Sequence, residues 1–175
     1  GPSDVAVAQD GTVFISDTGH ARIRRIAPDG TISTYAGSGD PDTVGDNGPA
    51  TSASLHSPRG LALTPDGTLY VAESGPDRVR RITPDGRIST AAGGGSPATG
   101  VGDGGRATSA SLDLPTDVAI DESGTLYIAD ALHHRVRTVT STGVIATFAG
   151  DGGAGSSGDG GAATAASIGE PYGVG

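Results

Sequence analysis

The stretch that decides the fold is Pro65–Thr90, PDGTLYVAESGPDRVRRITPDGRIST. Thr68–Glu73 alternates apolar and polar positions and is rich in β-branched and aromatic residues, which is typical of a β-strand. A break follows, Arg78–Thr83 resumes the extended pattern, and a Pro-Asp-Gly turn reverses the chain into Ile88–Ala92. This stretch therefore predicts three antiparallel strands joined by two turns.

The same passage occurs twice more, at Asp10–Thr34 and Ser123–Thr147. A further short strand is expected before each copy, in a motif that begins at Pro2, Pro58, Pro115 and Pro171. Fixed spacing of this kind is the mark of a repeat protein. We expect one domain over residues 1–175, made of units 2–57, 58–114 and 115–170, with 171–175 opening a fourth unit.

Each unit offers four strands in up-and-down order. The expected strands are Asp4–Val7, Thr12–Asp17, Arg22–Ala27 and Ile32–Ala36; Gly60–Leu63, Thr68–Glu73, Arg78–Thr83 and Ile88–Ala92; and Asp117–Ile120, Thr125–Asp130, Arg135–Thr140 and Val144–Ala149. Repeated four-stranded units predict an all-β fold, a β-propeller with three blades in this chain. A β-helix would need a shorter repeat, and a sandwich would not repeat this closely.

Long glycine-rich linkers follow the fourth strand of each unit. Each linker contains an aspartate, at Asp46, Asp103 and Asp159, and ends in an Ala-Thr-Ser/Ala-Ala-Ser segment. That segment predicts one or two helical turns, with Leu55, Leu112 and Ile168 as apolar plugs between blades. The aspartates admit a calcium interpretation, but with one carboxylate near each glycine cluster a turn or helix N-cap is favoured.

Composition narrows the classes of function. The chain has 31 Gly, 11 Pro and no Cys, which suits many turns and rules out disulfides and thiolate metal sites. A formal net charge of −9 argues against binding to nucleic acid or to an anionic membrane. No Gly-Lys-Ser/Thr follows a glycine cluster, so nothing indicates a nucleotide, and we expect no cofactor.

The units resemble NHL repeats. The matching residues are Asp-Gly-Thr followed by Val-Phe-Ile or Leu-Tyr-Val, then an acid, a turn and Arg-(Val/Ile)-Arg. The Gly-Asp-Gly-Gly linkers are similar to those of bacterial and teneurin-type repeats. The Asn-His-Leu triplet that names the family is replaced by residues such as Gly19-His20-Ala21, so no ligand is carried over from it. The resemblance implies a six-bladed propeller and favours an extracellular or periplasmic location.

Three blades cannot close a ring and leave two apolar sheet faces open. Because the resemblance implies six blades, we expect a homodimer of two half-propellers, or else an excised piece of a longer chain. Residues 171–175 would compete with the partner's residues 2–6 for one slot. Whether they pair within the chain or with a partner is left open.

Propeller topology places the long linkers and the inner strand starts on one face, where a protein or small-molecule ligand is expected to bind. The candidate ligand-binding residues there are Asp4, Arg59, Asp117, His20 and His133. His20 and His133 admit a metal interpretation, but solvated loop histidines are favoured, and no metal or catalytic residue is predicted.

Charged pairs repeat in every unit as well. We interpret Asp17/Arg22, Glu73/Arg78 and Asp130/Arg135 as ion pairs across hairpins or as turn caps that recur because the blade recurs. A basic stripe for RNA, formed by Arg24, Arg80 and Arg137 together with Arg25 and Arg81, is disfavoured, because stacking aromatics and positive charge are lacking.

Near-identical strands favour a non-enzymatic binding or scaffolding module. The alternative is a fragment of a propeller lyase or hydrolase with a metal in the central channel.

Overall fold

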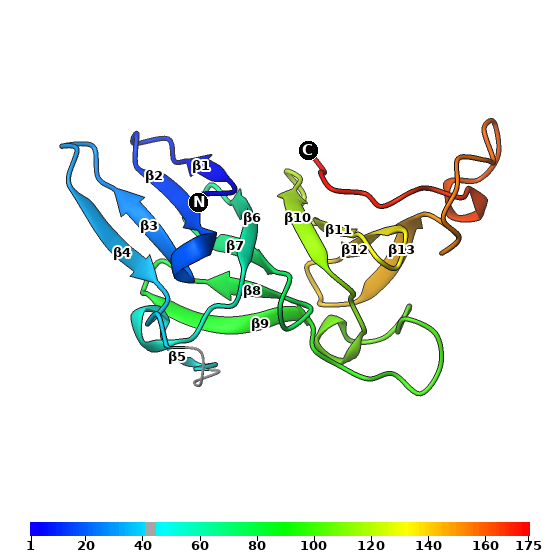
Figure 1. Cartoon of the computed structure of the whole chain (residues 1–175), viewed down its shortest axis with the longest axis horizontal. Coiled ribbons are helices and arrows are strands. Elements are labelled where there is room, and N and C mark those ends of the chain that lie inside the picture. The colour runs from blue at the N-terminus through cyan, green and yellow to red at the C-terminus, as the bar shows by residue number, and fades with distance from the viewer. Residues whose placement is uncertain (41–44) are drawn as a thin grey trace.

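The computed structural model describes residues 1–40 and 45–175, and it contains three antiparallel sheets, one after another along the chain (Figure 1). We call each sheet a blade. The first comprises β1 (Val5–Val7), β2 (Val13–Asp17), β3 (Arg22–Ile26) and β4 (Ile32–Ala36); the second β5 (Gly48–Pro49), β6 (Pro58–Leu63), β7 (Leu69–Glu73), β8 (Arg78–Ile82) and β9 (Arg87–Gly93); and the third β10 (Pro115–Ile120), β11 (Leu126–Asp130), β12 (Arg135–Val139) and β13 (Ile145–Ala149).

Strand order follows chain order in the first and third blades. The second blade has the order β5-β9-β8-β7-β6, because the linker after the first blade adds β5 to its outer edge. The predicted four strands of each unit are thus confirmed, with bounds that differ by at most two residues, whereas β5 was not foreseen. Its two residues, Gly48 and Pro49, carry no period-2 pattern that could reveal a strand.

Register within each blade places the acid at the end of one strand opposite an arginine at the start of the next: Asp17 opposite Arg22, Glu73 opposite Arg78, and Asp130 opposite Arg135. The turn between these strands needs a left-handed residue, which is Ala21, Asp77 or His134, each with φ between 51° and 53°. A positive φ in a residue with a Cβ carries a steric cost. The side chain of Asp77 links the second blade to the start of the third, because it accepts a hydrogen bond from the backbone N–H of Leu114 at 2.9 Å.

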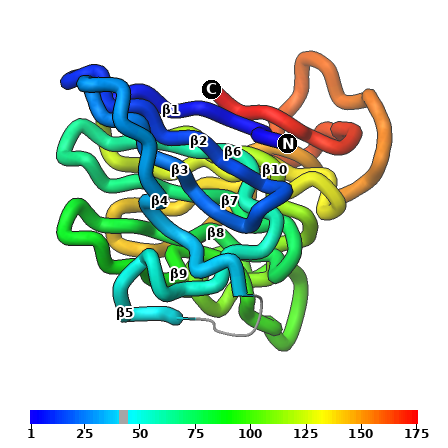
Figure 2. The backbone as a smooth tube through the Cα atoms, turned by 60° about the vertical axis from the view of Figure 1, so that its left-hand side comes forward, coloured from blue at the N-terminus to red at the C-terminus, as the bar shows by residue number. Residues whose placement is uncertain are grey.

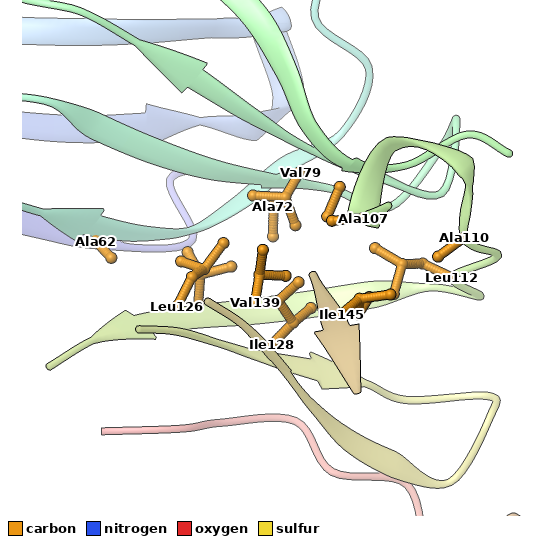
Figure 3. Packing of buried hydrophobic residues seen from close by; sticks show 12 residues of the cluster. Ala62, Ala72, Val79, Ala107, Ala110, Leu112, Leu126, Ile128, Val139 and Ile145 are labelled. Carbon is orange, nitrogen blue, oxygen red and sulfur yellow. The ribbon is translucent and has the colours of Figure 1, made fainter. Parts of the chain in front are cut away.

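Apolar residues of neighbouring blades meet in two clusters. One lies between the second and third blades (Figure 3). In it, Ala72 and Val79 of the second blade pack against Leu126 and Ile128 of the third, and all four are 3% exposed or less. The other cluster joins the first and second blades. The second blade therefore buries one set of side chains against the first blade and the alternate set against the third.

The linkers contain single 3-10 turns instead of longer helical segments, at η2 (Ala50–Ser52), η3 (Ala107–Ser109) and η4 (Ala163–Ala165). Leu55 and Leu112 are buried, as expected of plugs, and Ile168 is half-buried. In the described part of the chain every helix is a three-residue turn, too short to cross a membrane.

Both chain ends lie on the same side as the inner strands β1, β6 and β10 (Figure 2). The outer faces of the end blades are open. On the first blade Val5, Val7 and Ile32 are 53–64% exposed, and on the third Phe148 is 53% exposed. These are the faces that lack a neighbouring blade.

Candidate functional site

Three of the predicted ligand-binding residues come together where the inner strands begin. Asp4, Arg59 and Asp117 line one hollow of about 230 Å³, together with Ser3, Gly60, Thr116 and Tyr172. They reach it because β1, β6 and β10 start side by side, one per blade. Arg59 is held by a hydrogen bond from its Nε to Ser74 Oγ at 2.8 Å.

The two carboxylates of this hollow already have backbone partners in the following unit. Asp4 Oδ2 accepts a hydrogen bond from the N–H of Leu61 at 2.7 Å. Asp117 Oδ2 accepts one from the N–H of Val174 at 2.9 Å, so residues near the C-terminus repeat the arrangement found at the second blade. Burial raises the pKa of Asp117, and the nearby Asp4 adds to this effect. These aspartates therefore act as ties between successive units.

The second unit has a glycine, Gly60, at the position of Asp4 and Asp117, and this glycine lets the inner strands of the second and third blades approach closely. A Cβ added to Gly60 would lie 2.5 Å from Cα of Asp117, a distance that real atoms do not tolerate. Aspartate and glycine thus alternate from unit to unit, as Asp4, Gly60, Asp117 and Gly173. The hollow is narrow because the backbones of neighbouring blades nearly touch there.

The two candidate histidines do not line this hollow. His20 is exposed and its Nδ1 lies 2.8 Å from Asp17 Oδ1; it lines a separate hollow with His56. His133 Nδ1 lies 2.9 Å from Asp130 Oδ2, and this hydrogen bond raises the pKa of His133. The charge of Asp113 also raises this pKa, whereas burial and the charge of Arg137 act to lower it. Among the described residues, no group of three or more His, Asp or Glu side chains is placed to hold a metal.

Buried arginines are the feature that sequence reasoning missed. Arg80 and Arg137 are both 0% exposed, so two of the five arginines of the stripe considered for RNA cannot reach a ligand. Arg80 Nη1 lies 3.3 Å from Glu73 Oε2, and Arg137 Nη1 lies 3.1 Å from Asp130 Oδ2.

Among the residues that the structure describes, the predicted ion pair across the hairpin forms in the second blade and not in the other two. Arg78 Nε lies 2.7 Å from Glu73 Oε2. In the first blade Arg22 instead donates to the carbonyl of Ser38, and in the third Arg135 donates to the carbonyl of Asp151 at 2.6 Å. Asp17 and Asp130 then turn to His20 and His133.

Linker aspartates complete the buried arginine sites. Asp46 Oδ1 lies 2.5 Å from Arg80 Nη2, and Asp103 Oδ1 lies 2.5 Å from Arg137 Nη2. Although burial acts to raise the pKa of Asp103, bonds from Thr147 and Arg137 outweigh it and leave that pKa lowered. The N-cap interpretation is wrong for Asp46 and Asp103, because Pro49 and Arg106 occupy those cap positions; both carboxylates instead bind an arginine of the next blade.

A larger hollow, about 790 Å³, lies elsewhere, among the hairpin turns of the first and second blades. Its lining includes Asp10, Arg25, Tyr35 and Asp66. Sequence reasoning did not single it out, since it is formed by the wedge between two blades and by no motif of its own.

Comparison with known proteins places these features in a family. Residues 97–164 match the family model of the teneurin NHL domain, and residues 1–26 match that of the NHL repeat. Teneurin-1 of Caenorhabditis elegans is 34% identical over 155 residues, and teneurin-m of Drosophila melanogaster is 32% identical over 163 residues. These matches cover 82% and 86% of this chain but only 5% of each teneurin.

Solved structures agree on the fold. A Bacteroides thetaiotaomicron protein of unknown function has a TM-score of 0.72 at 21% identity, covering 98% of this chain and 41% of that one. Virginiamycin B lyase of Staphylococcus aureus gives 0.58 at 20% identity, covering 84% and 40%. A chain of the nidogen/laminin complex gives 0.60 at 20% identity, covering 85% and 48%. With its three successive antiparallel sheets, the chain is a run of NHL repeats of the type found in the teneurin NHL domain.

Proposed function

We propose that this chain is a non-enzymatic NHL propeller module for protein binding or scaffolding, and that two copies complete each other as a six-bladed ring. The observation that carries the proposal is the match between the two open faces of one chain. In the proposed ring, the open face of the third blade of one copy packs against the open face of the first blade of the other copy, at both ends of the half-ring.

The open face of the first blade has a buried counterpart inside the molecule. Val5, Val7 and Ile32 occupy the positions of Leu61, Leu63 and Ile88 in the second blade, where Leu61 and Ile88 are buried against the first blade.

The open face of the third blade has a buried counterpart too. Tyr127 and Phe148 stack edge to face, with ring centroids 5.3 Å apart. Phe14 and Tyr35 are the corresponding pair of the first blade, with centroids 4.7 Å apart, and they pack against the second blade. Covering Phe148 and the aliphatic face of the first blade would remove apolar area from water, which favours association.

Binding of a protein or small molecule is proposed on the face where the inner strands begin, at Asp4, Arg59 and Asp117, with His20 and His133 on the adjacent loops. Proteins similar in sequence are teneurins, and one protein similar in fold is part of a complex between nidogen and laminin. The carboxylates are engaged with backbone N–H groups, which favours a role in recognition and ring geometry over acid–base chemistry. A lyase or hydrolase with a metal in the channel would instead require stoichiometric metal on the purified protein, which elemental analysis measures.

Light scattering coupled to gel filtration tests the assembly. Over a concentration series we expect a mass of twice the 17.0 kDa of one chain. Phe148→Asp should return the mass to one chain, because it places a charge at the seam. Leu132→Asp, at a loop residue of similar exposure, should leave the dimer intact. A particle of 17.0 kDa at every concentration would overturn the proposal.

A further inference from the structure

Each seam between blades is closed by the same group of side chains, which we call the linker clasp. It consists of the linker aspartate and an arginine and a threonine of the following blade: Asp46 with Arg80 and Thr90, and Asp103 with Arg137 and Thr147. The threonine hydroxyl donates to the second carboxylate oxygen at 2.7 Å in the first clasp and 2.6 Å in the second. Both oxygens of the aspartate are therefore occupied.

Backbone hydrogen bonds fix the linker beside the clasp. The N–H of Asn47 donates to the carbonyl of Ile88 at 2.7 Å, and the N–H of Gly104 donates to that of Ile145 at 2.8 Å. Four residues after each aspartate, the N–H of Ala50 or Ala107 donates to the glycine carbonyl of the turn before that strand, at 2.8 and 2.9 Å. The linker thereby pairs with the outer edge strand of the next blade.

Within the described residues, one copy of each half of this clasp has no counterpart. Arg24 and Thr34 occupy the arginine and threonine positions in the first blade. Arg24 forms a hydrogen bond to the carbonyl of Ser33 and no ion pair within the described residues. Asp159, the third linker aspartate, is exposed and likewise forms no ion pair in the part of the chain that the structure describes.

The third linker already has the shape that the first two have when clasped. Gly160 has φ +79°, close to the +76° of Gly104 at the same position. The N–H of Gly161 donates to the carbonyl of Gly158 at 3.0 Å, as Gly105 donates to Gly102 at 3.2 Å. A segment held in its bound shape pays less ordering entropy on binding.

We propose that Asp159 of one copy forms the linker clasp with Arg24 and Thr34 of a second copy. This inference rests on the proposed dimer and adds the contact that fixes its register. By analogy with the internal seams, the N–H of Gly160 donates to the carbonyl of Ile32 of the second copy, and the N–H of Ala163 to that of Gly30. A two-fold ring contains this clasp twice, once at each seam.

Charge exchange tests the clasp. Arg24→Asp and Asp159→Arg each place like charges at both seams of their own dimer, so each variant alone should dissociate, with a dimer Kd raised at least tenfold. An equal mixture should dimerise again, because one seam then holds the native pair and the other holds the exchanged pair. Matched controls are Arg81→Asp and Asp66→Arg, which alter net charge equally at exposed positions of the second blade, away from the proposed seam.

The outcomes separate the clasp from the dimer. Loss of dimer in each variant and its recovery on mixing supports the clasp. If the unmodified chain dimerises and either variant does so with unchanged Kd, the clasp is wrong while the dimer stands. If the unmodified chain is a monomer, the dimer and the clasp are both wrong. Circular dichroism matching the unmodified chain shows that each variant has folded.

Discussion

Removing the charge of Asp130 should destabilise the fold far more than removing that of Asp103, although both bind Arg137. Asp130 and Arg137 have side chains that are 0% exposed, and their charged atoms lie 3.1 Å apart. Asp130 also accepts the N–H of Asp113 at 2.7 Å. Leaving a buried ion without its partner typically costs 3–5 kcal/mol. Because Asp103 is 43% exposed in its side chain, water replaces much of what its carboxylate provides.

We therefore expect Asp130→Asn to lower the free energy of unfolding by about 3 kcal/mol and Asp103→Asn by about 1 kcal/mol. Urea unfolding followed by far-UV circular dichroism measures both, since the chain has no Trp. Protein concentration must be equal in all samples, because association shifts apparent stability. An unchanged dependence on urea shows that the unfolding transition is the same. Equal losses for the two variants would refute the assignment of Asp130 and Arg137 as a buried pair.

Three further results are expected. Gly93→Ala should lower the free energy of unfolding by about 3 kcal/mol, because the added Cβ would lie 2.4 Å from a backbone carbonyl oxygen. Gly86→Ala, at a residue with a similar φ and open space around it, should lower it by about 1 kcal/mol. Equal losses in urea unfolding would contradict the crowding at Gly93. The stability of the chain relative to His133→Gln should be greatest below pH 6.5 and vanish as the pH rises through the raised pKa of the imidazole, because the protonated ring binds Asp130; a pH-independent difference would count against this bond. Deleting Pro171–Gly175 should tighten the dimer by freeing the slot at the third blade, and a weaker or unchanged dimer in light scattering would show that this segment does not compete.

The fold followed from the sequence because its signals are local and occur three times. Alternation in Thr68–Glu73 and glycines at the turns identify strands without reference to tertiary contacts. The charged contacts between blades did not follow, because an arginine in an alternating strand reads as solvent-exposed until its partner is known. A constant spacing in the sequence does accompany these ion pairs: Asp46 and Arg80 are separated by 34 residues, and so are Asp103 and Arg137.

The candidate site was predictable in part. Propeller topology correctly brings Asp4, Arg59 and Asp117 to one hollow, because the inner strands of successive blades start together. It could not assign His20 and His133, whose positions depend on hydrogen bonds to the acids three residues before them. Nor does topology reveal that the hollow's carboxylates are satisfied by backbone N–H groups of the next unit.

Cross-linking tests the central claim, that the third blade of one copy meets the first blade of another. Pro49 and Arg87 are opposite each other across an internal seam, and Ala162 and Thr31 are the corresponding residues of the proposed seam between copies. The chain has no cysteine, so introduced pairs react without background. Oxidised Thr31→Cys/Ala162→Cys should migrate as a covalent dimer on a non-reducing gel, while Pro49→Cys/Arg87→Cys should oxidise within one chain and each single variant should stay uncoupled. Complete oxidation of the internal pair with no dimer from the Thr31→Cys/Ala162→Cys chain would contradict the claim.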